Sequence, residues 1–163
     1  AFAGVPGGPM ATNEYWNGSS WTELADLNTG RRNGGSAGTV YTAAIYFGGS
    51  PPTSALAEQW DGSSWTEVGD LNTAREEIAG AGTSTAALST GGFTGSVTAK
   101  SEFWDGSSWT EVNDLSTGRR EVNSQSSNSN VSALVFGGSA PPYSALTEEF
   151  SAADFEIKSV TTS

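Results

Sequence analysis

The sequence predicts an all-β domain built from about four copies of one 44-residue unit. The segment WDGSSWTEV occurs at 60–68 and again, unchanged, at 104–112, and WNGSSWTEL at 16–24 is a near copy. With 21 glycines and 6 tryptophans, the composition is typical of many short strands joined by tight turns. At 163 residues the chain suits one ordinary domain, so we expect the copies to form a single domain over 1–163.

Other residues recur at the same period, including glutamates, aspartates, arginines and glycine pairs. Phe150 and Phe155 continue the two tryptophan series and indicate a degenerate last copy. A period of about 44 residues indicates a propeller or a solenoid. The expected repeats are approximately 1–26, which is partial, 27–70, 71–114 and 115–163.

Each copy has a strand-like pattern throughout. NGGSAGTV at 33–40 has very small side chains, as expected for the crowded innermost strand of a sheet whose neighbours converge. YTAAIYFGG at 41–49 is apolar and ends in a glycine pair, which predicts a buried strand. EQW then leads through the loop DGSS into WTEV, which predicts a hairpin in which Trp60 faces Trp65. Asp61, replaced by Asn17 in the first copy, suits the start of this loop because its side chain bonds the backbone ahead.

These features resemble the Kelch repeat of β-propellers. The common features are a glycine pair closing an apolar strand, an acidic-aromatic stretch some ten residues later, and a tryptophan soon after. FGG at 47–49 and 136–138, with Trp65 and Trp109, are the most specific parts, whereas STGG at 89–92 departs from the pattern. The repeated hairpin wording is similar, more narrowly, to Kelch-like repeats of bacteriophage tail-fibre and virion proteins. The resemblance implies a propeller of about four blades with four antiparallel strands each.

The first blade is expected to be incomplete. AFAGVPGG at 1–8 already has the pattern of a second strand, so the inner strand of the first copy is missing and about fifteen strands are expected. Four blades could close a disc if another segment filled the gap, but Kelch propellers more often have six or seven. An open arc completed by a second chain, or a fragment of a longer protein, are the alternatives, and we favour assembly with other chains. Because the chain begins at Ala1 without methionine, we expect a processed or trimmed product.

A charge cluster is predicted beside each hairpin. The predicted register sets two glutamates opposite one another, which is destabilising unless a cation lies between them, and an arginine follows eight residues after the second glutamate. The expected clusters are Glu14, Glu23 and Arg31; Glu58, Glu67 and Arg75; and Glu102, Glu111 and Arg119. The alternatives are a different register or a divalent cation between the glutamates. Calcium needs six or more oxygens and no DxDxDG-like loop is present, so we expect no metal.

The aromatic residues and the variable loops are the candidate binding features. Trp65 and Trp109 are expected to pack between blades, and a sugar-stacking platform is the alternative for the tryptophans. The loops after the glycine pairs differ most between copies, and we expect them to contact another subunit or a receptor unless they are plain exposed turns. The candidate residues are Pro51, Pro52, Phe93, Pro141, Pro142 and Tyr143. Asn17 and Asn130 lie in glycosylation sequons.

Composition argues against several functions. A net charge of −11 repels nucleic acids and anionic membranes, and no apolar run approaches the roughly 20 residues that span a bilayer. Without histidine or cysteine there is no imidazole base, no thiolate and no standard zinc or copper site, which removes the copper chemistry of galactose oxidase, a Kelch-type enzyme. Carboxylate pairs could hydrolyse glycosides, but they recur in every blade, whereas an active site breaks a repeat at one place. We therefore expect no enzyme activity and no cofactor.

The expected function is a non-enzymatic structural and adhesive module of a virion, as a tail fibre or surface protein, or of another extracellular assembly. It would act through multivalent loop contacts and subunit assembly. The expected partners are other copies of the chain or other virion proteins, with a cell-surface glycan as a further candidate. The alternative is a lectin-like propeller with a discrete sugar pocket. An intracellular adaptor of the eukaryotic Kelch kind fits less well, because nothing in the sequence resembles the partner domains of such adaptors.

Overall fold

The computed structural model describes residues 10–126, 132–140, 143–151 and 156–160. These residues form fourteen strands and no helix, which confirms the all-β prediction. The first seven strands are β1 (Asn13–Trp16), β2 (Trp21–Leu24), β3 (Gly35–Val40), β4 (Ala43–Phe47), β5 (Ala57–Trp60), β6 (Trp65–Val68) and β7 (Ala79–Thr83). The remaining strands are β8 (Ala86–Thr90), β9 (Ser101–Trp104), β10 (Trp109–Val112), β11 (Asn123–Ser126), β12 (Ser132–Phe136), β13 (Thr147–Ser151) and β14 (Glu156–Val160).

The strands form four antiparallel sheets in chain order. β1 and β2 make a two-stranded sheet, and β3 to β6, β7 to β10 and β11 to β14 make three sheets of four strands in which each strand pairs with the next along the chain. Each four-stranded sheet lies within one copy of the repeat. The segment 1–8, in which we predicted a further strand of the first copy, lies outside the described residues, as does Phe155.

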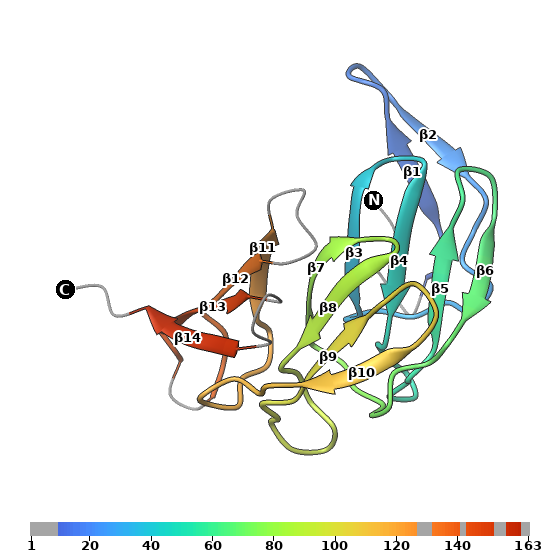
Figure 1. Ribbon diagram of the computed structural model, residues 1–163. Coiled ribbons are helices and arrows are strands. Elements are labelled where there is room, and N and C mark those ends of the chain that lie inside the picture. The colour runs from blue at the N-terminus through green and yellow to red at the C-terminus, as the bar shows by residue number, and fades with distance from the viewer. Residues whose placement is uncertain (1–9, 127–131, 141–142, 152–155, 161–163) are drawn as a thin grey trace.

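The first strands of the four-stranded sheets, β3, β7 and β11, lie side by side in the middle of the molecule, and the outer strands spread away from them (Figure 1). Their small residues allow this approach. A Cβ at Gly80 would lie 2.3 Å from the backbone oxygen of Ser36 in the neighbouring sheet. On the other side, the Ser124 hydroxyl donates a hydrogen bond of 2.6 Å to the carbonyl of Gly80. The prediction of small side chains where backbones converge is confirmed at this position.

The glycine pairs connect successive repeats. Gly49 N–H donates to the carbonyl of Arg75 at 2.8 Å, and Gly92 N–H donates to that of Arg119 at 2.7 Å. Gly48 adopts a φ of 66°, and a Cβ there would lie 2.6 Å from the Arg75 carbonyl. A side chain is therefore excluded both by the backbone conformation and by the neighbouring repeat.

The apolar core lies between the sheets. One buried cluster joins residues of the second and third sheets, among them Ile45, Phe47, Ile78 and Trp109. A second buried cluster joins Tyr46, Trp60 and Trp65 to Leu27, with Ala11 and Leu24 packed against it. In the part of the chain that the structure describes, no helix is long and apolar enough to cross a membrane.

Candidate functional site

The outer hairpins adopt the predicted register. Trp60 pairs with Trp65 and Glu58 with Glu67, and the equivalent residues of β1–β2 and β9–β10 pair in the same way. Asp61 begins the loop, and its Oδ1 accepts hydrogen bonds from the backbone N–H groups of Ser63 and Ser64, both at 2.8 Å. These N–H donors stabilise the ionised form and lower the pKa of the Asp61 carboxyl to about 2.

The other two hairpins repeat this loop. Asp105 accepts the same kind of bonds from Ser108 and Ser107, and its pKa is also lowered to about 2. In the first hairpin Asn17 replaces the aspartate, and its side-chain oxygen accepts from the N–H groups of Ser19 and Ser20. The predicted turn role of Asn17 is confirmed.

Three buried ion pairs recur at equivalent positions, and we call each an arginine clasp. In each clasp a guanidinium bonds a glutamate on the third strand of a four-stranded sheet, and both side chains are almost completely shielded from solvent. The clasps are Arg31 with Glu58 at 2.7 Å, Arg75 with Glu102 at 2.8 Å, and Arg119 with Glu148 at 2.5 Å.

Each clasp joins three segments of its repeat. In the central clasp, Arg75 Nη1 also donates to the carbonyls of Gly91 at 3.2 Å and Lys100 at 2.6 Å. The second oxygen of Glu102 accepts the backbone N–H of Asn72 at 2.7 Å. The clasp therefore holds the incoming connection, the end of the second strand and the start of the third strand together. Burial lowers the pKa of Arg75, and the charge of Glu102 opposes that shift.

The partners of the arginines differ from those predicted. We expected Arg75 between Glu58 and Glu67, but it binds Glu102, which follows it by 27 residues. Arg31 and Arg119 likewise bind a glutamate on the third strand of the sheet that follows them, and not the preceding pair. The physical reason is that each arginine precedes the first strand of a sheet and reaches the third strand of that same sheet. Only one glutamate of each facing pair in the second and third sheets is buried in a clasp.

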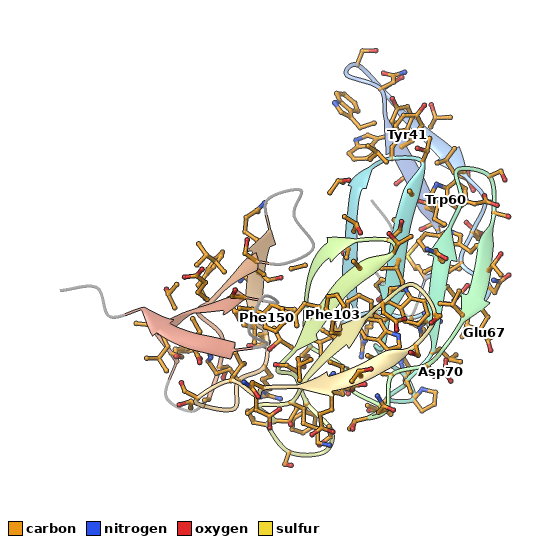
Figure 2. The ribbon with its side chains drawn as sticks, in the orientation of Figure 1. Tyr41, Trp60, Glu67, Asp70, Phe103 and Phe150 are labelled. Carbon is orange, nitrogen blue, oxygen red and sulfur yellow. The ribbon has the colours of Figure 1, made fainter. Side chains whose placement is uncertain are left out.

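The remaining predicted glutamates lie at the surface. Glu14, Glu23, Glu67 and Glu111 are exposed, and Glu67 lies on the outer side of the second sheet (Figure 2). Glu111 forms an ion pair with Lys100 at 3.6 Å, which reduces the repulsion between Glu111 and Glu102. Among the described residues, no group of three or more carboxylates is arranged to hold a metal ion.

The hairpin tryptophans are buried in the second and third sheets. Trp65 and Trp109 are 6% and 5% exposed, which confirms the prediction that they pack inside the protein. Trp60 and Trp104 are buried as well, and their indole N–H groups donate to the carbonyls of Tyr41 and Ser84 at the tips of the preceding hairpins.

The first hairpin is the exception. Trp16 and Trp21 are 46% and 54% exposed, although their rings contact one another at a centroid distance of 5.4 Å. They border an open cleft of about 460 Å³ between β1–β2 and the β3–β4 hairpin. Tyr41 borders this cleft at the hairpin tip (Figure 2), and its ring lies against that of Tyr15 with 4.2 Å between the ring centroids and a tilt of 31°. This cleft was not predicted from the sequence, although the expected lack of an inner strand in the first copy was a signal for it.

The variable loops are in part exposed and in part structural. Pro51 and Pro52 are exposed, and Tyr143 is 85% exposed. Phe93 is half-buried because the guanidinium of Arg120 lies 5.1 Å from its ring centre. Pro141 and Pro142 lie outside the described residues, as does Asn130.

One structural contact was missed in the sequence analysis. Asn28 and Asn72 each donate from the side-chain amide to the carbonyl of a hairpin tryptophan, Trp65 and Trp109, at 2.9 and 2.8 Å. These bonds tie the segment before the second and third sheets to the outer strand of the same sheet. The recurring segments LNTGR, LNTAR and LSTGR indicate a conserved role for this asparagine within the repeat, since serine replaces it only in the last copy.

Comparison with known proteins supports the fold alone. No protein-family model matches the chain, and no curated protein matches it in sequence. A solved structure titled "Structure of YjhT" superposes with a TM-score of 0.71 at 13% sequence identity, covering 86% of this chain and 49% of that chain. The two proteins therefore share a fold over the matched part, and the present chain spans about half the length of that relative.

Proposed function

We propose that the chain is a non-enzymatic structural and adhesive module built as a Kelch-like β-propeller of about four blades, the first of them incomplete. Each four-stranded sheet is one blade, and β3, β7 and β11 are the innermost strands. The order of the strands within each sheet and the convergence of these three strands support this arrangement. The repeated hairpin sequence supports a role as a component of a virion, either a tail fibre or a surface protein, or of another extracellular assembly.

The observation that carries the proposal is the contrast between the repeated residues and the variable loops. The arginines and glutamates of the clasps and the tryptophans of the complete hairpins are buried, so they are used to hold the blades. The loops after the glycine pairs differ between copies and display exposed groups such as Pro51, Pro52 and Tyr143. The repeat is thus a rigid support, and the loops are the part that is free to recognise a partner.

The mechanism follows from this division. Several loops on one rigid body make individually weak contacts, and their binding energies combine when assembled copies engage a surface together. The partner is another protein of the assembly or a cell-surface glycan. Nucleic acid and anionic membranes are disfavoured by the net charge of −11. The facing glutamate pairs of the second and third sheets lend no support to glycoside hydrolysis, because Glu58 and Glu102 are each neutralised by an arginine.

Adhesion is tested by comparing the free chain with the same chain coupled densely to beads, on a panel of intact bacterial cells. We expect the beads to bind at least about a hundredfold more tightly than the free chain, because binding is multivalent. In a matched variant, residues 137–146 are replaced by the loop of the preceding repeat, residues 91–100, and binding should fall. Equal binding by all three forms, or none on any cell, would contradict the proposal.

A carbohydrate-binding module is the second candidate, favoured by the aromatic cleft. Exposed rings of Trp16, Trp21 and Tyr41 can stack on sugar rings, and Glu14 and Asn13 line the same cleft with hydrogen-bonding groups. Titration with simple glycans while tryptophan fluorescence is recorded tests this candidate. Saturable quenching that disappears in Trp16→Ala would support it, and an unchanged signal across a broad panel would exclude it.

A further inference from the structure

In the part of the last sheet that the structure describes, two apolar side chains of β12 are partly exposed. Along β12 the side chains alternate, so that Ala133 and Val135 are buried whereas Leu134 and Phe136 are 45% and 40% exposed. Alternation places the exposed pair on one side of the sheet, away from the buried pair that packs beside the preceding sheet. We call the surface formed by Leu134 and Phe136 the tail.

The same positions are buried in the other repeats. Alignment on the glycine pairs sets Phe136 opposite Phe47 and Thr90, and Leu134 opposite Ile45 and Leu88. These four counterparts are at most 4% exposed, and Phe47, Ile45 and Leu88 lie in buried clusters with residues of the following repeat. The tail is therefore far more exposed than the same positions in the other repeats, because no described sheet follows the last one.

The first hairpin has the complementary feature. Trp21 corresponds to Trp65 and Trp109, which are buried against the preceding repeat, yet Trp21 is 54% exposed. Trp16 beside it is 46% exposed, whereas its counterparts Trp60 and Trp104 are at most 3% exposed. We call the surface formed by Trp16 and Trp21 the head.

A contact inside the chain shows how a residue at the head position packs on a residue at the tail position. Trp109 packs on Phe47 of the preceding repeat with 4.8 Å between the ring centroids, at an interplanar angle of 64°. Phe47 occupies the tail position of its repeat, and Trp109 occupies the head position of the next repeat. The contact is thus an internal example of a tryptophan from one repeat covering a phenylalanine from the repeat before it.

We propose that a second copy of the chain docks head to tail, with Trp21 of one copy packed on Phe136 of the other in the manner of Trp109 on Phe47. The proposal rests on the propeller arrangement proposed above. A second copy is the favoured occupant because one chain carries both surfaces and each is the apolar partner that the other lacks. A contact between two different surfaces of identical chains closes into a ring when the rotation fits.

The ring that we propose contains two copies. The chain matches 49% of the length of the solved relative, so in that protein a comparable length of chain lies outside the matched part. Two copies of the present chain together would be about as long as that relative. Both heads and both tails would then be covered, and the exposed tryptophans of the first hairpin would become as buried as their counterparts.

The test measures the mass of the intact chain by light scattering from micromolar to sub-millimolar concentration. We expect a species of about twice 16.8 kDa. Trp21→Glu removes the head and Phe136→Glu removes the tail, and each variant alone should remain a monomer, with self-association weakened at least about thirtyfold. Thr110→Glu is the matched control, because it adds the same charge at an exposed position on the outer strand of the third sheet. It should behave as the unmodified chain does.

Mixing the two variants is the decisive step. The Trp21→Glu chain keeps its tail and the Phe136→Glu chain keeps its head, so the equimolar mixture should form a pair containing one of each. Pairing through two heads or through two tails would not be restored in this way. A monomeric unmodified chain, variants that associate as it does, loss of association in Thr110→Glu, or no pairing in the mixture would each overturn the proposal.

This experiment separates the inference from the adhesive function. It requires no receptor, so a monomeric chain that still adheres to cells through its loops would refute the head-to-tail contact alone. A paired chain that binds no cell would refute adhesion alone. Melting temperatures of all variants, recorded by circular dichroism, confirm that each monomer is folded, as expected for substitutions of side chains that are 40% and 54% exposed.

Discussion

Trp109 lies edge-on against Phe47, and this contact joins two repeats within the buried apolar cluster between the second and third sheets. Both rings are almost fully buried, and the tryptophan also touches its hairpin partner Trp104 at a centroid distance of 5.5 Å. The relationship is informative because the same two positions are exposed at the two ends of the array, in Trp21 and Phe136. Burial of a repeated residue here depends on its neighbour and not on its own repeat.

Replacing Trp109 by alanine should strongly destabilise the protein. Loss of a buried aromatic side chain and the cavity it leaves cost about 3 to 5 kcal/mol. The same replacement at Trp21 removes an exposed ring and should cost about 1 kcal/mol or less when measured at low protein concentration. Chemical denaturation of both variants tests the comparison. Similar losses for the two variants would mean that the packing on Phe47 contributes little.

Replacing Arg75 by alanine should lower the melting temperature. The substitution leaves Glu102 buried without its cation, and breaking a buried ion pair in this way costs about 3 to 5 kcal/mol. Lys100→Ala is the control, since it removes an exposed ion pair with Glu111 that contributes about 1 kcal/mol or less. Thermal melting followed by circular dichroism measures both. An unchanged melting temperature for Arg75→Ala would show that the clasp does not stabilise the fold.

Acid should destabilise the hairpin loops through Asp61 and Asp105. Their folded pKa of about 2 is below the usual aspartate value of 3.8, so the ionised form is favoured by folding. The stabilisation is present above pH 3.8 and is lost as the pH falls towards 2. Asparagine keeps the accepting oxygen, as Asn17 does, but does not titrate. The double variant Asp61→Asn/Asp105→Asn should therefore lose less stability than the unmodified chain over this interval, and parallel pH curves would contradict the assignment.

Salt should strengthen the head-to-tail pairing. Two chains that each carry a net charge of −11 repel one another, and dissolved ions screen this repulsion, whereas the proposed contact is apolar. Raising sodium chloride from about 0.02 M to about 0.5 M should lower the dissociation constant measured by sedimentation. Weaker pairing at high salt would instead indicate an interface held by ion pairs.

Much of the local structure was predictable from the sequence because it depends on short-range chemistry. The loop DGSS follows from the ability of Asp61 to accept two backbone N–H groups nearby, and this loop determines which residues of the hairpin face one another. The small residues around Gly80 and the glycine pair at Gly48 likewise indicated close approach of neighbouring backbones. Because the hairpin sequence is repeated, each local prediction made for one copy also applied to the other copies.

The partners of the arginines were not predictable in the same way. Arg75 was expected to neutralise the carboxylates that precede it in the sequence. It binds Glu102 instead, on β9, the third strand of the sheet that follows Arg75. The charge of a buried arginine indicates that it needs a carboxylate partner. The spacing of the repeat does not indicate which of the equivalent glutamates that arginine reaches. That choice depends on the course of the incoming connection, whose Asn72 N–H and Arg75 guanidinium both bond Glu102 on the third strand.

The sequence by itself determined the all-β class, the repeat, the hairpin register and the turn residues, because each of these depends on residues close together in the chain. Only the tertiary structure decided which copies of a repeated residue are buried. Trp21 and Trp109 have nearly the same neighbours in sequence, but among the described residues only Trp109 has a preceding sheet that covers it. The physical reason is that burial of an aromatic ring depends on contact between successive sheets, and such contact is a property of the array and not of the repeat.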